Sequence, residues 1–240
     1  MVNIALQLWV TDGPTPEAIK QAADAGYDGV EFAFEVEEHD PAAVRAALEE
    51  TGLTVAGAHV SIDQLREKFD WTVDFYQQLG CDTIVIPYLD DAHFEDTNAV
   101  AEIAAEMNNI SSELQEHGFG LGYHNHDHEF HDVGGLTALE ALAAELDESI
   151  EIELDIRHAA RAGVDPLPLV TRLADRLSIL HVADVDVDAA EPVPIGEGDV
   201  DVSACLAEAI DDGIEWIVYE DGPDVEGFSS AAQAIRSSIN

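Results

Sequence analysis

The stretch Ala25-Gly26-Tyr27-Asp28-Gly29-Val30-Glu31 joins the end of a predicted helix to the start of a predicted strand. Its first glycine is typical of a helix C-terminus, because glycine readily adopts the left-handed conformation found there. The same arrangement recurs at Leu79-Gly80-Cys81-Asp82-Thr83-Ile84 and at Asp212-Gly213-Ile214-Glu215-Trp216-Ile217. Each junction therefore predicts a helix, a short turn and a new strand.

Extending this pattern in both directions gives eight strand–helix units in the chain. The strands are predicted at residues 3–8, 29–32, 53–59, 83–87, 119–123, 150–154, 177–181 and 215–219. The helices are predicted at residues 15–26, 41–52, 63–79, 96–117, 136–146, 166–174, 202–210 and 229–238, with Thr15 as the cap of the first. Eight such units in 240 residues indicate an α/β fold, a single (β/α)8 TIM barrel, with residues 1–240 as one domain.

The charge balance is strongly acidic, with 51 acidic and 9 basic side chains and a net charge of −42. Hydrophobic residues make up 47% of the chain, which is too many for a disordered acidic protein. Nine cations cannot easily form the basic surface that nucleic-acid binding needs, so we expect no nucleic-acid partner. The acidic surplus is spread along the chain rather than clustered for a basic partner. We interpret it as adaptation to molar intracellular salt, which screens the repulsion.

Other classes of protein are excluded by simple features of the sequence. No apolar run reaches the roughly 18 residues of a membrane span, so we expect no membrane association. The first residues lack the basic segment of a signal peptide, and we expect none. The two cysteines, Cys81 and Cys205, form neither a zinc motif nor a disulfide framework. These features together predict a cytoplasmic protein.

Four chemically active residues lie at the ends of four successive predicted strands. They are His124, Asp155, His181 and Glu220. In a TIM barrel the active site lies at the carboxyl ends of the strands, and alternate strand residues point inward. Two imidazoles and two carboxylates that converge on one opening suit a divalent metal ion with open coordination positions. The sequence therefore predicts a metal site at this end of the barrel.

Other side chains near the same strand ends are candidates for the surrounding pocket. Trp9 follows the first strand, Glu31 lies at the second, His59 ends the third, and His126 lies in the histidine-rich segment after the fifth. Glu153 shares a face with Asp155, which would place its carboxylate inside the barrel. A buried carboxylate needs a partner, because an unpaired buried charge is costly.

Taken together, these segments resemble the xylose-isomerase-like barrel superfamily, in the branch described as sugar phosphate isomerases/epimerases. The matching segments are Gly29-Val30-Glu31, Gly57-Ala58-His59-Val60, Tyr123-His124-Asn125-His126-Asp127, Leu154-Asp155-Ile156-Arg157-His158-Ala159, Leu180-His181-Val182-Ala183-Asp184, Ile195-Gly196-Glu197-Gly198 and Val218-Tyr219-Glu220. The resemblance extends from the first strand to the last helix, but it does not specify a substrate.

The resemblance implies one divalent ion, with manganese, zinc, cobalt and magnesium as candidates. Ketose epimerases of this superfamily hold their ion with a Glu, an Asp, a His and a second Glu, and use the two glutamates as an acid/base pair. Asp155, His181 and Glu220 fall on the last three positions, and His158 falls on a histidine that contacts substrate. His124 occupies the first Glu position, so a symmetric epimerisation by two glutamates is not expected here.

The chemistry implied by the resemblance is proton transfer next to a carbonyl through an enediolate. Glu220, His59 and His158 are the predicted catalytic residues, since a carboxylate or an imidazole can remove such a proton. Isomerisation, epimerisation and dehydration remain open, the last as in inosose dehydratases. A sugar-binding barrel without turnover is an alternative outside enzymology. The abasic-site endonuclease of the same superfamily would need more metal ligands and a cationic surface.

The predicted partner is a small carbohydrate or cyclitol, contacted by Trp9, Glu31, His126, Arg157 and His158. Phosphate recognition needs cations or free helix N-termini. Near the strand ends the chain offers Arg157, Arg161 and Arg66, and it has Ala183 where many relatives have Lys. A neutral or acidic sugar and a sugar phosphate both remain open. The oligomeric state is left open, with a homodimer as one option that the resemblance implies, because relatives are often dimers.

Overall fold

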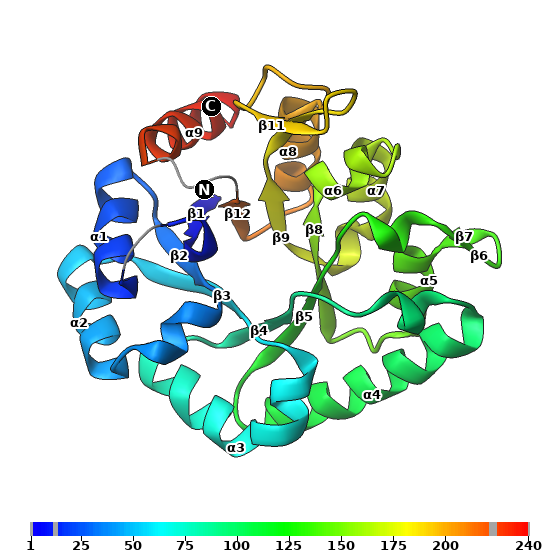
Figure 1. The fold of residues 1–240 in the computed structure, drawn as a ribbon, viewed down its shortest axis with the longest axis horizontal. Helices are drawn as coiled ribbons and strands as arrows, with labels where there is room; N and C mark the ends of the chain where they lie inside the picture. Colours follow the sequence, from blue (N-terminus) through cyan, green and yellow to red (C-terminus); the bar gives the residue numbers. More distant parts are fainter. Residues whose placement is uncertain (1, 12–13, 221–224, 240) are drawn as a thin grey trace.

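The strands of the computed structural model, which describes residues 2–11, 14–220 and 225–239, form a closed parallel barrel (Figure 1). Around the barrel the strands follow the order β1-β12-β9-β8-β5-β4-β3-β2. Their bounds are β1 Asn3–Gln7, β2 Gly29–Phe32, β3 Thr54–His59, β4 Thr83–Ile86, β5 Gly120–His124, β8 Ile150–Asp155, β9 Leu177–Val182 and β12 Trp216–Tyr219. The predicted single (β/α)8 TIM barrel is thereby confirmed.

Helices surround this barrel and cover its outer face (Figure 1). Their bounds are α1 Thr15–Ala25, α2 Pro41–Thr51, α3 Ile62–Leu79, α4 Thr97–Glu116, α5 Ala138–Glu145, α6 Ile156–Arg161, α7 Pro166–Leu173, α8 Val202–Asp211 and α9 Val225–Ser238. Short 3-10 turns follow several strands, and two small hairpins lie outside the barrel, β6 Asp132–Val133 with β7 Leu136–Thr137, and β10 Asp184–Asp186 with β11 Glu191–Val193. In the described part of the chain, no helix is long and apolar enough to span a membrane.

Local sequence signals explain where most helices begin and end. Ser61 and Asp96 cap the backbone N–H groups that begin α3 and α4, as short polar side chains do at helix starts. Gly26 and Gly80 end α1 and α3 in the left-handed conformation, with φ of 94° and 74°. The structure therefore confirms the helix–turn–strand junctions that the sequence predicts at these glycines.

The structure differs from the predicted elements in several places: α9 begins at Val225 rather than at residue 229, and the two small hairpins were not predicted. Pro14, rather than Thr15, occupies the cap position of α1, because the chain already turns helical at Thr15. The helix predicted from residue 136 begins at Ala138, since Leu136 and Thr137 pair with the preceding β6 strand. The short helix α6 was not predicted; it starts at the end of β8 and is capped by the Asp155 carboxylate.

Two apolar layers hold the barrel together. The larger layer fills the space between the outer strand faces and the helices. The smaller one lies inside the barrel and consists of Ala5, Ala56, Ile179, Trp216 and Val218. The Trp216 ring packs so closely against Gly29 that a Cβ there would approach it to 2.7 Å. The barrel interior beyond this apolar layer, toward the carboxyl ends of the strands, is polar.

Candidate active site

Four neighbouring strands, β5, β8, β9 and β12, deliver the side chains that the sequence predicts as metal ligands. One donor atom each from His124, Asp155, His181 and Glu220 lies within 4.8 Å of the others. The ring Nδ1 of His181 lies 2.9 Å from Glu220 Oε2. Parallel strands end at the same rim of a barrel, which is why residues so far apart in sequence meet here.

Asp155 is held in place by its own surroundings. Its Oδ1 accepts a hydrogen bond from the backbone N–H of His158 at 2.9 Å, as a helix cap does. The side chain of Asn125 bonds to the Asp155 backbone N–H at 3.0 Å and to its carbonyl at 3.3 Å. Burial would raise the pKa of Asp155, but the nearby Arg157 guanidinium, followed by the His158 and His124 rings, lowers it. The carboxylate is therefore rigid and ionised.

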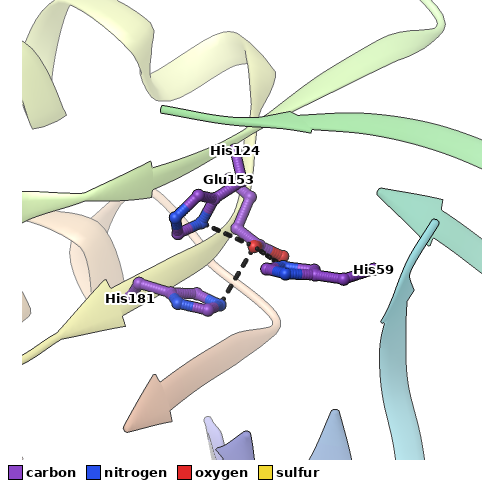
Figure 2. Close-up of side chains that lie close together, drawn as sticks. All are labelled: His59, His124, Glu153 and His181. Carbon is purple, nitrogen blue, oxygen red and sulfur yellow. Dashed lines mark hydrogen bonds and ion pairs between the residues drawn. The ribbon is translucent and has the colours of Figure 1, made fainter. Parts of the chain in front are cut away.

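Glu153 lies beneath these residues, surrounded by histidine rings (Figure 2). Its Oε1 accepts hydrogen bonds from His59 Nε2 at 2.7 Å and from His124 Nδ1 at 2.9 Å. His181 Nε2 lies 3.0 Å from the same oxygen. All four side chains are buried, and these histidines are the partners that the sequence could not identify for Glu153.

Glu31 and Gln7 contact the same group of side chains. Together with Glu153, His59, His124 and His181 they form what we call the buried cluster. Glu31 is fully buried, and its Oε2 lies 2.9 Å from His181 Nε2 and 3.4 Å from His59 Nε2. Gln7 Nε2 donates to Glu31 Oε2 at 3.0 Å and lies 3.4 Å from His59 Nδ1. The sequence predicts Glu31 as a substrate contact, but the structure places it under the cavity, among the histidines.

The charges in the buried cluster oppose the effect of burial. Burial alone would lower the pKa of His181, but Glu153 and Glu31 hold it well above its usual value. The pKa of His59 is raised in the same way. Burial would raise the pKa of Glu153, yet His181 and His59 hold it well below the usual range. Without a metal ion, protons on the histidines thus balance the buried carboxylates.

His126 and His158 lie beside His124 and behave differently. Their ring centroids are 4.6 Å apart. Burial lowers the pKa of His158, and burial with the neighbouring His124 and His158 rings lowers the pKa of His126 to about 3. Both Nδ1 atoms are buried and have no hydrogen-bond partner among the described residues. Each of these neutral imidazoles therefore keeps an unused hydrogen-bonding position beside His124.

A cavity of about 260 Å³ opens above the cluster at the carboxyl end of the barrel. Its lining includes Trp9, His59, His124, His126 and Glu220 from the predicted site, together with Gln7, Ala33, Phe34, Pro87 and Tyr88. Trp9, Phe34 and Tyr88 are 57%, 46% and 46% exposed and form an aromatic rim. A larger hollow of about 840 Å³ at the other end of the barrel contains none of the predicted site residues.

The cations near the opening are already engaged. The Arg157 guanidinium lies 3.4 Å from Asp155 Oδ2 and donates to the Glu220 carbonyl at 3.2 Å. Arg161 lies 3.6 Å from Asp127 Oδ2. Arg66 bonds to Glu106 and Asp63 on the outer helices. The cations that a phosphate group would need therefore face carboxylates of the protein itself.

The residues at the opening fit a divalent metal ion. Two imidazoles and two carboxylates within 4.8 Å of one another are a donor set typical of zinc, manganese and related ions. Two of these donor atoms, His181 Nδ1 and Glu220 Oε2, lie 2.9 Å apart. The sequence missed Gln7 as part of the site; its position at the end of the first strand was the available signal.

Comparisons with known proteins agree with this architecture. An inosose dehydratase from Geobacillus kaustophilus is 23% identical over 231 aligned residues, covering 80% of this chain and 71% of that protein. A sugar phosphate isomerase/epimerase from Parabacteroides distasonis has a TM-score of 0.82 at 18% identity, covering 100% of this chain and 96% of that one. A D-allulose 3-epimerase from Methylomonas sp. has a TM-score of 0.75 at 19% identity, covering 99% and 98%.

At such identities, the likeness to solved structures establishes the fold. The family assignment rests on the sequence, since residues 19–238 match the model described as "Xylose isomerase-like TIM barrel". That match covers all the strands that carry the clustered side chains except β1. The chain therefore belongs to the xylose isomerase-like TIM barrel family.

Proposed function

We propose that this protein is a divalent-metal-dependent isomerase or epimerase of an unphosphorylated sugar or cyclitol, acting by proton transfer next to a carbonyl. The observation that carries the proposal is the meeting of His124, Asp155, His181 and Glu220 donor atoms within 4.8 Å, beside a cavity lined by His124 and Glu220. The names of the relatives, which include sugar epimerases, support the same chemistry.

The four residues named above would hold the metal ion. When bound, such an ion stabilises negative charge that develops on a substrate oxygen as the neighbouring C–H bond breaks. Asp155 and Glu220 carry a full negative charge for this purpose, because cationic neighbours outweigh burial and lower their pKa values. His124 in place of a carboxylate leaves the ligand set with two negative charges rather than three.

Proton transfer is assigned to groups with a free acceptor position at the cavity. Glu220 lines the cavity. His158 lies behind the lining residue His126, with ring centroids 4.6 Å apart, and is a neutral imidazole with an unpartnered Nδ1 among the described residues. One of them takes the proton from the substrate carbon, and the C–H electron pair forms the carbon–carbon double bond of the enediolate. His59 also lines the cavity, but both its ring nitrogens contact Gln7 and Glu153, so we assign it a supporting role.

The fate of the enediolate defines the reaction. Return of the proton to the neighbouring carbon is isomerisation, and return to the opposite face of the same carbon is epimerisation. Expulsion of a β-hydroxyl, protonated as it leaves, gives water and an unsaturated ketone. This dehydration is the second candidate, because the curated relatives are inosose dehydratases.

The absence of free cations at the described part of the opening supports an unphosphorylated substrate. Arg157 and Arg161 contact Asp155 and Asp127, whereas a phosphate would need them itself. The aromatic rim of Trp9, Phe34 and Tyr88 offers flat apolar surfaces to the C–H face of a ring instead.

Solvent deuterium exchange tests the proposal. The protein, loaded with Mn²⁺ in deuterated buffer, is incubated with ketoses, their phosphate esters and an inosose, and the products are analysed by mass spectrometry and NMR. We expect deuterium in an unphosphorylated substrate, and loss of exchange by at least about 100-fold in His158→Gln with metal content unchanged. Exchange only with phosphate esters would overturn the substrate class, and no exchange with any compound would favour a binding barrel.

A further inference from the structure

One carboxylate oxygen inside the barrel contacts three histidines from three different strands. Glu153 Oε1 lies 2.7 Å from His59 Nε2, 2.9 Å from His124 Nδ1 and 3.0 Å from His181 Nε2 (Figure 2). A carboxylate only accepts hydrogen bonds, so the nitrogens of His59 and His124 that bond to it must carry the proton. His181 Nε2 makes no aligned hydrogen bond, but the negative charges of Glu153 at 3.0 Å and Glu31 at 2.9 Å favour a proton on it. In each ring, the nitrogen that faces Glu153 therefore carries the proton.

The alignment of these contacts distinguishes hydrogen bonding from an inner metal site. The donor atoms of His59, His124, Glu153 and His181 also lie within 4.8 Å of one another. However, the His59 and His124 rings are aligned with the carboxylate oxygen as hydrogen-bond donors. All three ring nitrogens face one oxygen, Glu153 Oε1, which is an acceptor shared by the rings. The arrangement is therefore a hydrogen-bonded support for the rings.

The consequence for the two proposed metal ligands follows from imidazole chemistry. A neutral imidazole has one N–H and one lone pair, so a proton held on one nitrogen leaves the other free to bind a metal. Because Nδ1 of His124 donates to Glu153, Nε2 of His124 is the nitrogen left to bind the metal. Nε2 of His181 lies between Glu153 and Glu31. Nδ1 of His181, which faces Glu220, is therefore the nitrogen left to bind the metal.

Neighbouring groups keep the Glu153 carboxylate in this position. His59 is braced on its far side by Gln7, whose amide lies 3.4 Å from His59 Nδ1. The same amide donates to Glu31 Oε2. Burial of Glu153, His59 and His181 excludes water, which could otherwise bond to the rings in other orientations.

We propose that Glu153 is a positioning residue that holds His124 and His181 in the tautomers required for metal binding. The inference rests on the proposed function for the identity of the metal ligands. It predicts that Glu153 controls metal affinity although it does not itself ligate the ion. Outer carboxylates on ligand histidines commonly contribute about 10- to 100-fold to metal affinity.

The experiment compares wild type with Glu153→Gln and with the matched control Glu151→Gln, two residues earlier on the same strand and half-buried at the other end of the barrel. Affinity for Mn²⁺ is measured by competition with a chromophoric chelator. The histidine tautomers are measured by ¹⁵N NMR of the Zn²⁺-loaded protein. In wild type we expect an Nδ1–H tautomer for His124 and an Nε2–H tautomer for His181.

In Glu153→Gln, we expect metal affinity to fall about 10- to 100-fold, with mixed tautomers at both histidines, while Glu151→Gln stays at the wild-type value. Wild-type affinity and unchanged tautomers in Glu153→Gln would overturn the inference and leave the proposed function intact. Failure of wild type to bind Mn²⁺ and Zn²⁺ would overturn both. If Glu153→Gln does not fold, Glu153→Asp replaces it: the shorter side chain draws the carboxylate away from the rings, so the same fall in affinity and the same mixed tautomers are expected, and wild-type values would overturn the inference.

Discussion

At the scale of single residues, His181 has the most demanding position in the molecule. It is completely buried, its Nδ1 lies 2.9 Å from Glu220, and its Nε2 lies between Glu31 and Glu153. Both nitrogens thus face carboxylates, which makes the ring cationic when no metal is present. A metal ion at Nδ1 would replace one of those protons, so this residue connects the buried cluster with the proposed metal site.

His181→Ala is expected to abolish metal uptake. The substitution removes one proposed ligand and leaves Glu31 and Glu153 without a cationic partner, so bound Mn²⁺ should fall from about one ion per chain to none detectable. Elemental analysis after purification without chelator measures the result. His117→Ala, at the end of α4 and outside the cluster, serves as the control. Equal metal content in the two variants would contradict the assignment.

The metal-free protein is expected to lose stability as the pH rises above neutrality. The folded-state pKa of His181 is raised above its ordinary 6.5, so its contribution is complete below that value and disappears as pH rises through the raised pKa. Thermal melts in chelator between about pH 6 and pH 9 should show a falling midpoint. The slope should be smaller in Glu153→Gln, and an equal slope in both proteins would argue against this coupling.

At the scale of elements, the β10–β11 hairpin and the loop after it depend on Asp184. This buried carboxylate accepts backbone N–H groups from Val185 at 2.9 Å and Val200 at 3.1 Å on one oxygen. Gly196 at 2.9 Å and Gly198 at 3.0 Å donate to the other. Gly198 has no room for a side chain, since a Cβ would lie 2.6 Å from the Val185 carbonyl oxygen. One side chain therefore organises the loop that leads to α8.

Asp184→Asn is expected to destabilise this loop and the protein. An amide can accept on one side only, so two backbone N–H groups would face an NH₂ group in place of an oxygen. Hydrogen bonds to charged groups contribute about 1.5–3 kcal/mol each, and we expect a loss of about 3 kcal/mol in the free energy of unfolding. Denaturant titration measures it, with Asp186→Asn as the control. A loss below about 1 kcal/mol in Asp184→Asn would contradict this role.

At the scale of the whole molecule, the net charge of −42 makes the stability of the fold dependent on salt. Like charges repel within the folded chain, and salt screens them, with a Debye length of about 3 Å at 1 M. We expect the thermal midpoint to rise by about 10 °C between about 0.1 M and about 2 M KCl. Thermal melts measure this, with an uncharged osmolyte at equal osmolarity as the control. A midpoint unchanged by KCl would contradict the interpretation of adaptation to salt.

The barrel could be predicted from the sequence because its signals are local. Helix C-terminal glycines such as Gly26 and Gly80, followed at once by strand residues, act within a few residues of the chain. The alternation of inward and outward residues along strands is equally local, and it brought His124, Asp155, His181 and Glu220 to one opening. The ends of elements were less certain, as at Leu136, where pairing with another strand competes with helix formation.

What only the tertiary structure decided is which of these groups contact one another. Sequence spacing placed Glu153 inside the barrel but could not identify its partners, because His59, His124 and His181 come from three other strands. The contact of Glu31 with His181 inside the barrel could likewise not be predicted from the sequence. Strand order and register in a closed barrel are set by the packing of the whole chain, and side-chain contacts across its interior follow from them.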